Sequence, residues 1–125
     1  MGLCEGDFTL GPTVKEEAPF DRYRVNLRAI DSAAVSALRW AQAAGQIIVI
    51  DEIGPMGMLS ELLCQTVLEI LAGEAVVLGT IVERSHRLAD RVRRHPRVRL
   101  RPVTPANRDE LPARIAAELG QIWLG

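Results

Sequence analysis

The sequence lacks the features that mark membrane-spanning and secreted proteins. It contains no run of about 18 apolar residues, which is what a transmembrane helix requires. Its start, MGLCEGDFTL, carries acidic side chains where a secretory signal has a basic start and an apolar centre. We therefore expect a cytoplasmic protein with no membrane partner.

Cysteine and lysine are also scarce. Cys4 and Cys64 lie far apart and form no C-x-x-C pair, so the chain shows neither a disulfide framework nor a thiol metal site. Lys15 is the only lysine, and eight of the fourteen arginines fall between residues 84 and 101. The net charge of −1 favours no polyanionic partner. We interpret the arginine block mainly as a solvated face, with phosphate contacts from one or two arginines as an alternative and nucleic acid as an unlikely partner.

The composition of the chain is typical of one globular domain. Its 125 residues are 48% hydrophobic and 25% charged, which suffices for a single hydrophobic core. Residues 1–24 contain several glycines and prolines without clean periodicity, so we expect an irregular segment there, with a short extended piece at 8–10. The single folded domain is expected at residues 25–125.

Helical and strand patterns alternate through the expected domain. Helical periodicity with capping residues predicts helices at 31–45, 60–73, 85–95 and 107–119. Their expected N-caps are Asp31 or Ser32, Ser60, Ser85 and Asn107. Two continuous apolar runs, at 47–50 and 75–81, predict strands buried on both faces, and an alternating pattern at 98–103 predicts a half-exposed strand. This order predicts an α/β domain with a mainly parallel sheet and right-handed crossovers.

Two carboxylates follow the apolar run at 47–50. In open parallel sheets, ligands bind beyond the carboxyl ends of the strands, where Asp51 and Glu52 are expected. Four apolar residues followed by Asp-Glu form the Walker B pattern. In that pattern the aspartate helps to hold Mg²⁺ and the glutamate orients and deprotonates the attacking water. On its own, the pattern fits solvated acids at a strand end equally well.

Four collinear stretches make the pattern more specific: RYRVNLRAID, IIVIDEIGPMGMLSE, AVVLGTIVERSH and VTPANRDELP. Together they resemble the THEP1-like nucleoside-triphosphatases, small P-loop NTPases also called cancer-related NTPases, over about residues 20–120. The resemblance implies a three-layer, parallel-sheet P-loop NTPase-like fold. It also implies an enzyme that hydrolyses nucleoside triphosphates, such as ATP or GTP, to the diphosphate and phosphate with Mg²⁺ as cofactor.

The resemblance also assigns roles to individual residues. Asp51 becomes the Mg²⁺ residue, Glu52 the general base, and Gly54 a close-approach position near the terminal phosphate. Arg84 is expected to contact phosphate oxygens and to stabilise charge in the transition state, with Arg87 as the other candidate.

The late motif supplies the expected nucleotide-base pocket. Asn107 and Arg108 lie where the family builds it, with an amide for hydrogen bonds and a guanidinium for stacking. Simpler roles stay open for these groups: Arg84 as a surface residue, Asn107 as a helix cap, and His86 and His95 as surface or capping residues.

The phosphate-binding loop of that family, G-x-x-x-x-G-K-S/T, is missing from the sequence. The nearest imitation spans residues 6–11, but Pro12-Thr13 follow where the loop has lysine and then serine or threonine, so proline replaces the required lysine. We therefore expect a fold truncated at its N-terminus, without the central strand that precedes the loop.

Loss of a central strand would leave unpaired backbone groups on two strand edges, and each such buried group costs about 1–3 kcal/mol. Three arrangements would relieve this. The strands at 75–81 and 98–103 pair with each other, the segment near 8–10 inserts, or a second chain completes the sheet, including by self-association.

Two functions of different classes follow from these observations. The leading hypothesis is a Mg-dependent nucleoside-triphosphatase whose activity as a lone chain is uncertain. The alternative is a non-catalytic nucleotide-binding or protein-interaction module that kept the fold and lost turnover together with the phosphate loop.

Overall fold

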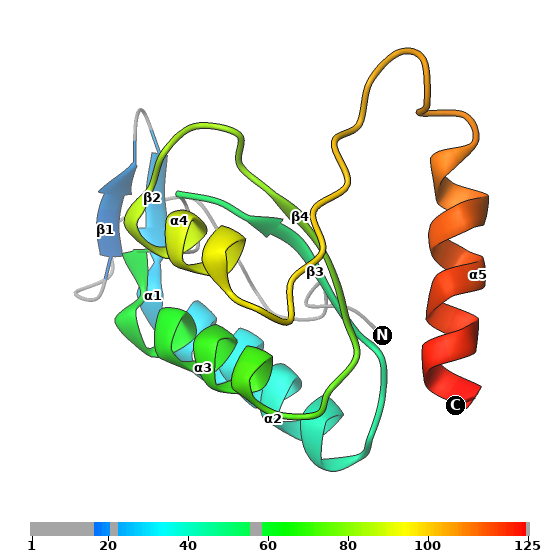
Figure 1. Cartoon of the computed structure of the whole chain (residues 1–125). Helices are drawn as coiled ribbons and strands as arrows, with labels where there is room; N and C mark the ends of the chain where they lie inside the picture. The colour runs from blue at the N-terminus through cyan, green and yellow to red at the C-terminus, as the bar shows by residue number, and fades with distance from the viewer. Residues whose placement is uncertain (1–16, 21–22, 56–58, 125) are drawn as a thin grey trace.

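The computed structural model describes residues 17–20, 23–55 and 59–124, so the expected extended piece at 8–10 lies outside the described residues (Figure 1). Residues 27–43 form one continuous helical segment that contains a π-helical turn. In chain order the elements are β1 (Glu17–Phe20), β2 (Tyr23–Asn26), α1 (Leu27–Ala29), η2 (Ile30–Ala34), α2 (Val35–Ala43), β3 (Ile48–Ile53), α3 (Glu61–Ala72), β4 (Val77–Ile81), α4 (Arg87–Arg94) and α5 (Leu111–Leu124).

The first two strands form an antiparallel hairpin, with Glu17 opposite Asn26. It occupies part of the segment for which the sequence predicts irregular structure, because a short strand becomes recognisable only through its pairing partner. The following helix also begins earlier than the predicted residue 31. Asn26 caps it, its side-chain Oδ1 accepting a hydrogen bond from the Ala29 amide at 3.0 Å.

The second sheet contains the parallel pair β3 and β4, connected through α3. Ile48 lies opposite Val77 and Ile50 opposite Gly79, and the register shifts before Ile53 pairs with Ile81. The prediction of parallel strands joined by a helix is therefore confirmed. The helix at 60–73 is confirmed as well, since the Ser60 hydroxyl accepts from the Leu63 amide at 3.1 Å and caps α3.

Helices α2, α3 and α4 cover one face of the β3–β4 sheet. Alternate side chains of β3 are buried on that face, where Ile48 and Ile50 pack in a core that also contains Leu38, Val67, Ile70, Leu88 and Val92. On the opposite face Val49 is 41% exposed. The prediction that this strand is buried on both faces is therefore wrong for the described structure.

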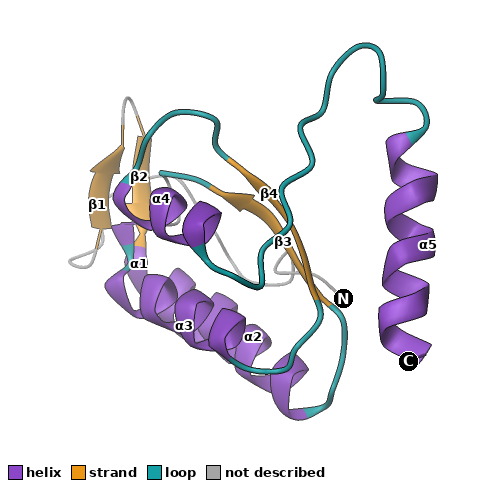
Figure 2. Ribbon diagram, viewed as in Figure 1, coloured by secondary structure: helices purple, strands orange, loops and turns teal. Residues whose placement is uncertain are grey.

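The C-terminal part also differs from the prediction. Residues 98–103 form no strand, and Leu100 and Val103 are exposed. A strand needs a partner for its backbone groups, and in the described part of the chain β4 pairs with β3 alone, so the first of the three arrangements is ruled out. Helix α5 stands apart from the sheet (Figure 2), so the described elements do not form the third layer. The parallel sheet with its helices is consistent with a P-loop NTPase-like α/β fold.

Candidate functional site at the carboxyl end of the parallel strands

The two carboxylates of the Walker B pattern lie within β3. The sequence predicts Asp51 and Glu52 beyond the end of the strand. The strand continues to Ile53, however, so both acids lie in its second half. Both are exposed, whereas Ile50 before them and Ile53 after them are buried. Buried neighbours on both sides hold the backbone of the two acids in place and leave their carboxylates accessible.

Thr80 contacts one of these acids from the neighbouring strand. Its hydroxyl donates to Oδ1 of Asp51 across 2.6 Å. A hydrogen bond to a charged acceptor is stronger than a neutral one and fixes the orientation of the carboxylate. The sequence contained a usable signal, because Thr80 is the one hydroxyl-bearing residue in the apolar run AVVLGTI and that run was expected to form a strand.

The donor set at this site suits a hard cation. Across the described residues, no group of three or more His, Cys, Asp or Glu side chains could hold a metal ion. Mg²⁺ prefers oxygen ligands, keeps several waters and is often bound by one or two carboxylates together with phosphate oxygens. The exposed Asp51 carboxylate, oriented by Thr80, fits that mode of binding.

Gly54 follows β3 and is buried. A Cβ atom placed there would lie 2.6 Å from Oε1 of Glu52 and 3.0 Å from its Cδ. The glycine therefore leaves room for the Glu52 side chain to fold back over the turn. The group that closely approaches Gly54 in the structure is therefore the Glu52 side chain. The approach of a terminal phosphate to Gly54 stays a prediction.

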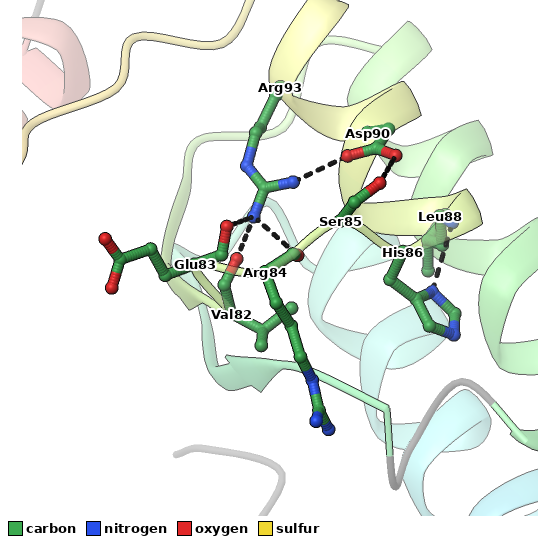
Figure 3. A network of polar contacts seen from close by, with 8 residues as sticks. All are labelled: Val82, Glu83, Arg84, Ser85, His86, Leu88, Asp90 and Arg93. Carbon is green, nitrogen blue, oxygen red and sulfur yellow. Dashed lines mark hydrogen bonds and ion pairs between the residues drawn. The ribbon is translucent and has the colours of Figure 1, made fainter.

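The loop after β4 carries Arg84, which is exposed. In Figure 3 its side chain extends away from Arg93 and Asp90. Helix α4 is capped by His86, whose Nδ1 accepts from the Leu88 amide at 3.3 Å, and not by the predicted Ser85. The Ser85 hydroxyl donates to Oδ2 of Asp90 at 2.6 Å, which links the loop to α4.

Arg87, the first residue of α4, lies near Cys64 of α3. Burial raises the pKa of the Cys64 thiol, and the positive charge of the nearby Arg87 partly opposes that rise. Arg87 is exposed, so its guanidinium is accessible to a ligand.

Several arginines of the basic block have partners within the protein. Arg93 pairs with Asp90 at 2.7 Å, Arg97 donates to the Leu71 carbonyl at 3.1 Å, and Arg101 pairs with Glu118 at 3.1 Å. These arginines therefore make intramolecular contacts that stabilise the fold. The contacts make the block a poorer match to a continuous surface for polyanions.

Asn107 and Arg108 lie in the turn before α5. The Asn107 side chain stabilises that turn, since its Oδ1 accepts from the Thr104 amide and its Nδ2 donates to the Pro102 carbonyl, both at 2.8 Å. The Asn107 side chain therefore closes this turn, instead of capping the helix as the sequence predicts. The Arg108 side chain makes a long ion pair with Asp109, at 4.0 Å. In Figure 1 this turn stands beside α5, apart from the carboxyl ends of β3 and β4, so the structure does not bring the predicted base pocket and Asp51 together.

Comparison with known proteins identifies the family of this chain. A family model described as NTPase matches residues 5–116. The nucleoside-triphosphatase THEP1 of Thermofilum pendens is 38% identical over 104 residues, which are 81% of this chain and 57% of that protein. Its namesake in Methanothermobacter thermautotrophicus is 32% identical over 121 residues, 96% of this chain and 68% of that protein. The chain belongs to the THEP1 nucleoside-triphosphatase family.

The fold comparison agrees. The crystal structure of THEP1 from the hyperthermophile Aquifex aeolicus matches with a TM-score of 0.75 and 30% identity, over 86% of this chain and 66% of that one. This THEP1-family chain thus spans between 57% and 68% of the length of these relatives. The resemblance noted in the sequence is confirmed at the level of family and fold. Among the described helices, none is long and apolar enough to cross a membrane.

Proposed function

We propose that this chain carries the metal-binding and water-activating part of a nucleoside-triphosphatase, which hydrolyses nucleoside triphosphates such as ATP or GTP to the diphosphate and phosphate. One observation carries the proposal above all. The Asp51 carboxylate is held by the Thr80 hydroxyl across two parallel strands, with Glu52 beside it, in a chain of the THEP1 family.

Each residue of the site has a part in the proposed reaction. Bound Mg²⁺ would neutralise phosphate charge, with Asp51 as its protein ligand. Glu52 accepts the proton of the attacking water, a role worth about 10²- to 10⁴-fold in rate. Gly54 leaves the space in which the Glu52 carboxylate turns. Arg84 donates hydrogen bonds to phosphate oxygens as negative charge builds up.

The remaining candidates have a weaker basis. Arg87 is exposed at the start of α4 and offers a second guanidinium to phosphate. The Arg108 side chain is 68% exposed, which suits stacking on a nucleobase. The Asn107 amide already bonds within its own turn, so any base contact would require it to exchange a partner.

The proposed function requires a segment that completes the β3–β4 sheet. The β3–β4 sheet has two strands, and no other described strand pairs with β4. A pair of strands alone is marginally stable in water, and parallel sheets are normally covered on both faces. We propose that a second chain, or a second copy of this one, adds a strand at β4, and that the lysine-bearing phosphate loop comes from outside residues 1–125.

Phosphate release from ATP and GTP tests the proposed function. The purified chain is assayed with Mg²⁺, alone and with a fragment that carries a G-x-x-x-x-G-K-S/T loop. Glu52→Gln is expected to lower kcat by about 10²- to 10⁴-fold, and removal of Mg²⁺ by a chelator is expected to abolish turnover. Glu74→Gln is the matched control, because Glu74 is exposed and precedes β4, at the other end of the sheet from Asp51. Absence of turnover even with the fragment would refute the proposal.

A non-catalytic nucleotide-binding module is the second candidate. It is favoured by the scarcity of lysine. Lys15 is the single lysine of the sequence, and it lies too far beyond the G-x-x-x-x-G segment at residues 6–11 to serve a phosphate loop. Calorimetry with Mg-ATP and Mg-GTP separates the two candidates. Binding without phosphate release supports the module, whereas turnover by this chain alone excludes it.

A further inference from the structure

One guanidinium on α4 holds the loop that carries Arg84. The Arg93 side chain is 21% exposed and reaches from α4 back to the end of β4 (Figure 3). Its Nη2 donates to the carbonyl of Val82, to that of Glu83 at 3.0 Å and to that of Arg84 at 3.2 Å. Three successive carbonyl oxygens of the loop therefore converge on a single nitrogen.

Asp90 completes this contact from the same helix. Its Oδ1 accepts from Nη1 of Arg93 at 2.7 Å, and its Oδ2 accepts from the Ser85 hydroxyl at 2.6 Å. The hydrogen bond from Ser85, followed by the His86 amide and Arg93, holds the pKa of the Asp90 carboxyl below its ordinary value. The loop is thus held at Val82–Arg84 by Arg93 and at Ser85 by Asp90, on both sides of the Arg84 side chain.

We propose that Arg93 is a positioning residue for Arg84, an inference that rests on the role proposed for Arg84 in hydrolysis. The Arg84 side chain makes none of the contacts in this clamp and extends from it on the opposite side (Figure 3). Fixing the backbone on both sides of Arg84 fixes the point from which its guanidinium reaches a phosphate. Transition-state contacts depend on such placement to within a fraction of an ångström.

Arginine is the residue type that this position requires. Its planar fork presents separate nitrogens, so that one faces the carbonyl oxygens while the other binds the carboxylate. Lysine offers one compact nitrogen, which cannot occupy both places. Arg93→Lys keeps the charge and the aliphatic stem, and therefore tests the clamp with little disturbance of α4.

Hydrogen exchange tests the clamp without reference to activity. Amides of residues 82–86 are expected to exchange roughly 10- to 100-fold faster in Arg93→Ala, the factor that corresponds to losing a charge-assisted hydrogen bond. Arg93→Lys is expected to fall between Arg93→Ala and the wild type. Arg91→Ala is the matched control, because Arg91 is an exposed arginine of the same helix. Unchanged exchange at 82–86 in both Arg93 variants would overturn the inference.

Turnover with the phosphate-loop fragment tests the catalytic consequence. Arg93→Ala is expected to lower kcat with little change in KM, whereas Arg91→Ala leaves both unchanged. In an Arg84→Ala background, Arg93→Ala is expected to cause no further loss, because a positioning residue acts through the group it positions. Independent, additive losses would overturn the positioning role. If the wild type shows no turnover, the proposed function fails together with this catalytic part, and the exchange data still decide whether Arg93 orders the loop.

Discussion

Replacing Ser60 with alanine is expected to destabilise α3, the helix that it caps. Ser60 is 3% exposed and makes two contacts with one hydroxyl group. It accepts from the Leu63 amide at 3.1 Å and donates to the Asp31 carboxylate. The same atom therefore caps α3 and ties it to η2.

The expected loss is about 2 kcal/mol. An alanine at a helix N-cap costs about 1 kcal/mol, within a range of about 0.5 to 2. The bond to Asp31 adds about 0.2 to 1 kcal/mol, since Asp31 is exposed and its charge is screened by solvent. For a domain of this size, about 2 kcal/mol corresponds to a fall in Tm of roughly 6 to 12 °C.

Urea unfolding followed by far-ultraviolet circular dichroism measures this loss. Ser36→Ala is the matched control, because Ser36 is exposed within α2 and its replacement is expected to change the free energy of unfolding by less than about 0.5 kcal/mol. Asp31→Ala removes the bond between the helices and leaves the cap. If Ser60→Ala unfolds within about 0.5 kcal/mol of the wild type, the capping role assigned to this hydroxyl is wrong.

Two further predictions concern the site and the loop. Gly54→Ala places a methyl group 2.6 Å from Oε1 of Glu52, so we expect the carboxylate to move and kcat to fall by up to about 10²-fold with little loss of stability. Gly120→Ala, where nothing lies within 4 Å, serves as its control, and equal kcat values would contradict the prediction. The lowered folded-state pKa of Asp90 means that its carboxylate contributes stability above its unfolded-state pKa, and that this contribution is lost as the pH falls through the lower folded-state value. The difference in free energy of unfolding between the wild type and Asp90→Asn should hold from pH 7 to about pH 5 and shrink below about pH 4, and an equal difference at about pH 3 would be inconsistent with the shift.

The sequence was sufficient wherever a structure depends on neighbours along the chain. Ser60 could be recognised as a cap because a cap bonds an amide three residues further on. The strand patterns at 47–50 and 75–81 predicted β3 and β4, since a helix between two apolar runs favours parallel pairing. The prediction failed at 98–103, because alternation marks a strand only where a partner strand lies beside it.

Side-chain contacts between segments that are distant along the chain could not be predicted from the sequence pattern. Whether Ser85 or His86 caps α4 depends on where the loop after β4 places each side chain. Nδ1 of His86 accepts from the Leu88 amide, while the Ser85 hydroxyl donates to Asp90. Arg93 belonged to an arginine block interpreted as mainly solvated, and the three carbonyl oxygens that it contacts lie 9 to 11 residues away along the chain. Such side-chain partners are set by the return of the chain after β4, which local periodicity does not encode.

By itself, the sequence determined the family, the alternation of helices and strands from α2 to α4, and the presence of Asp51 and Glu52 near the carboxyl end of a parallel strand. These features depend on residue types at fixed spacing, and spacing is a property of the chain. Only the tertiary structure decided that Thr80 orients Asp51, that Arg93 holds the loop of Arg84, and that one face of the β3–β4 sheet is exposed at Val49. Hydrogen bonds act over about 3 Å, so they depend on which distant segments the packing of the core brings together.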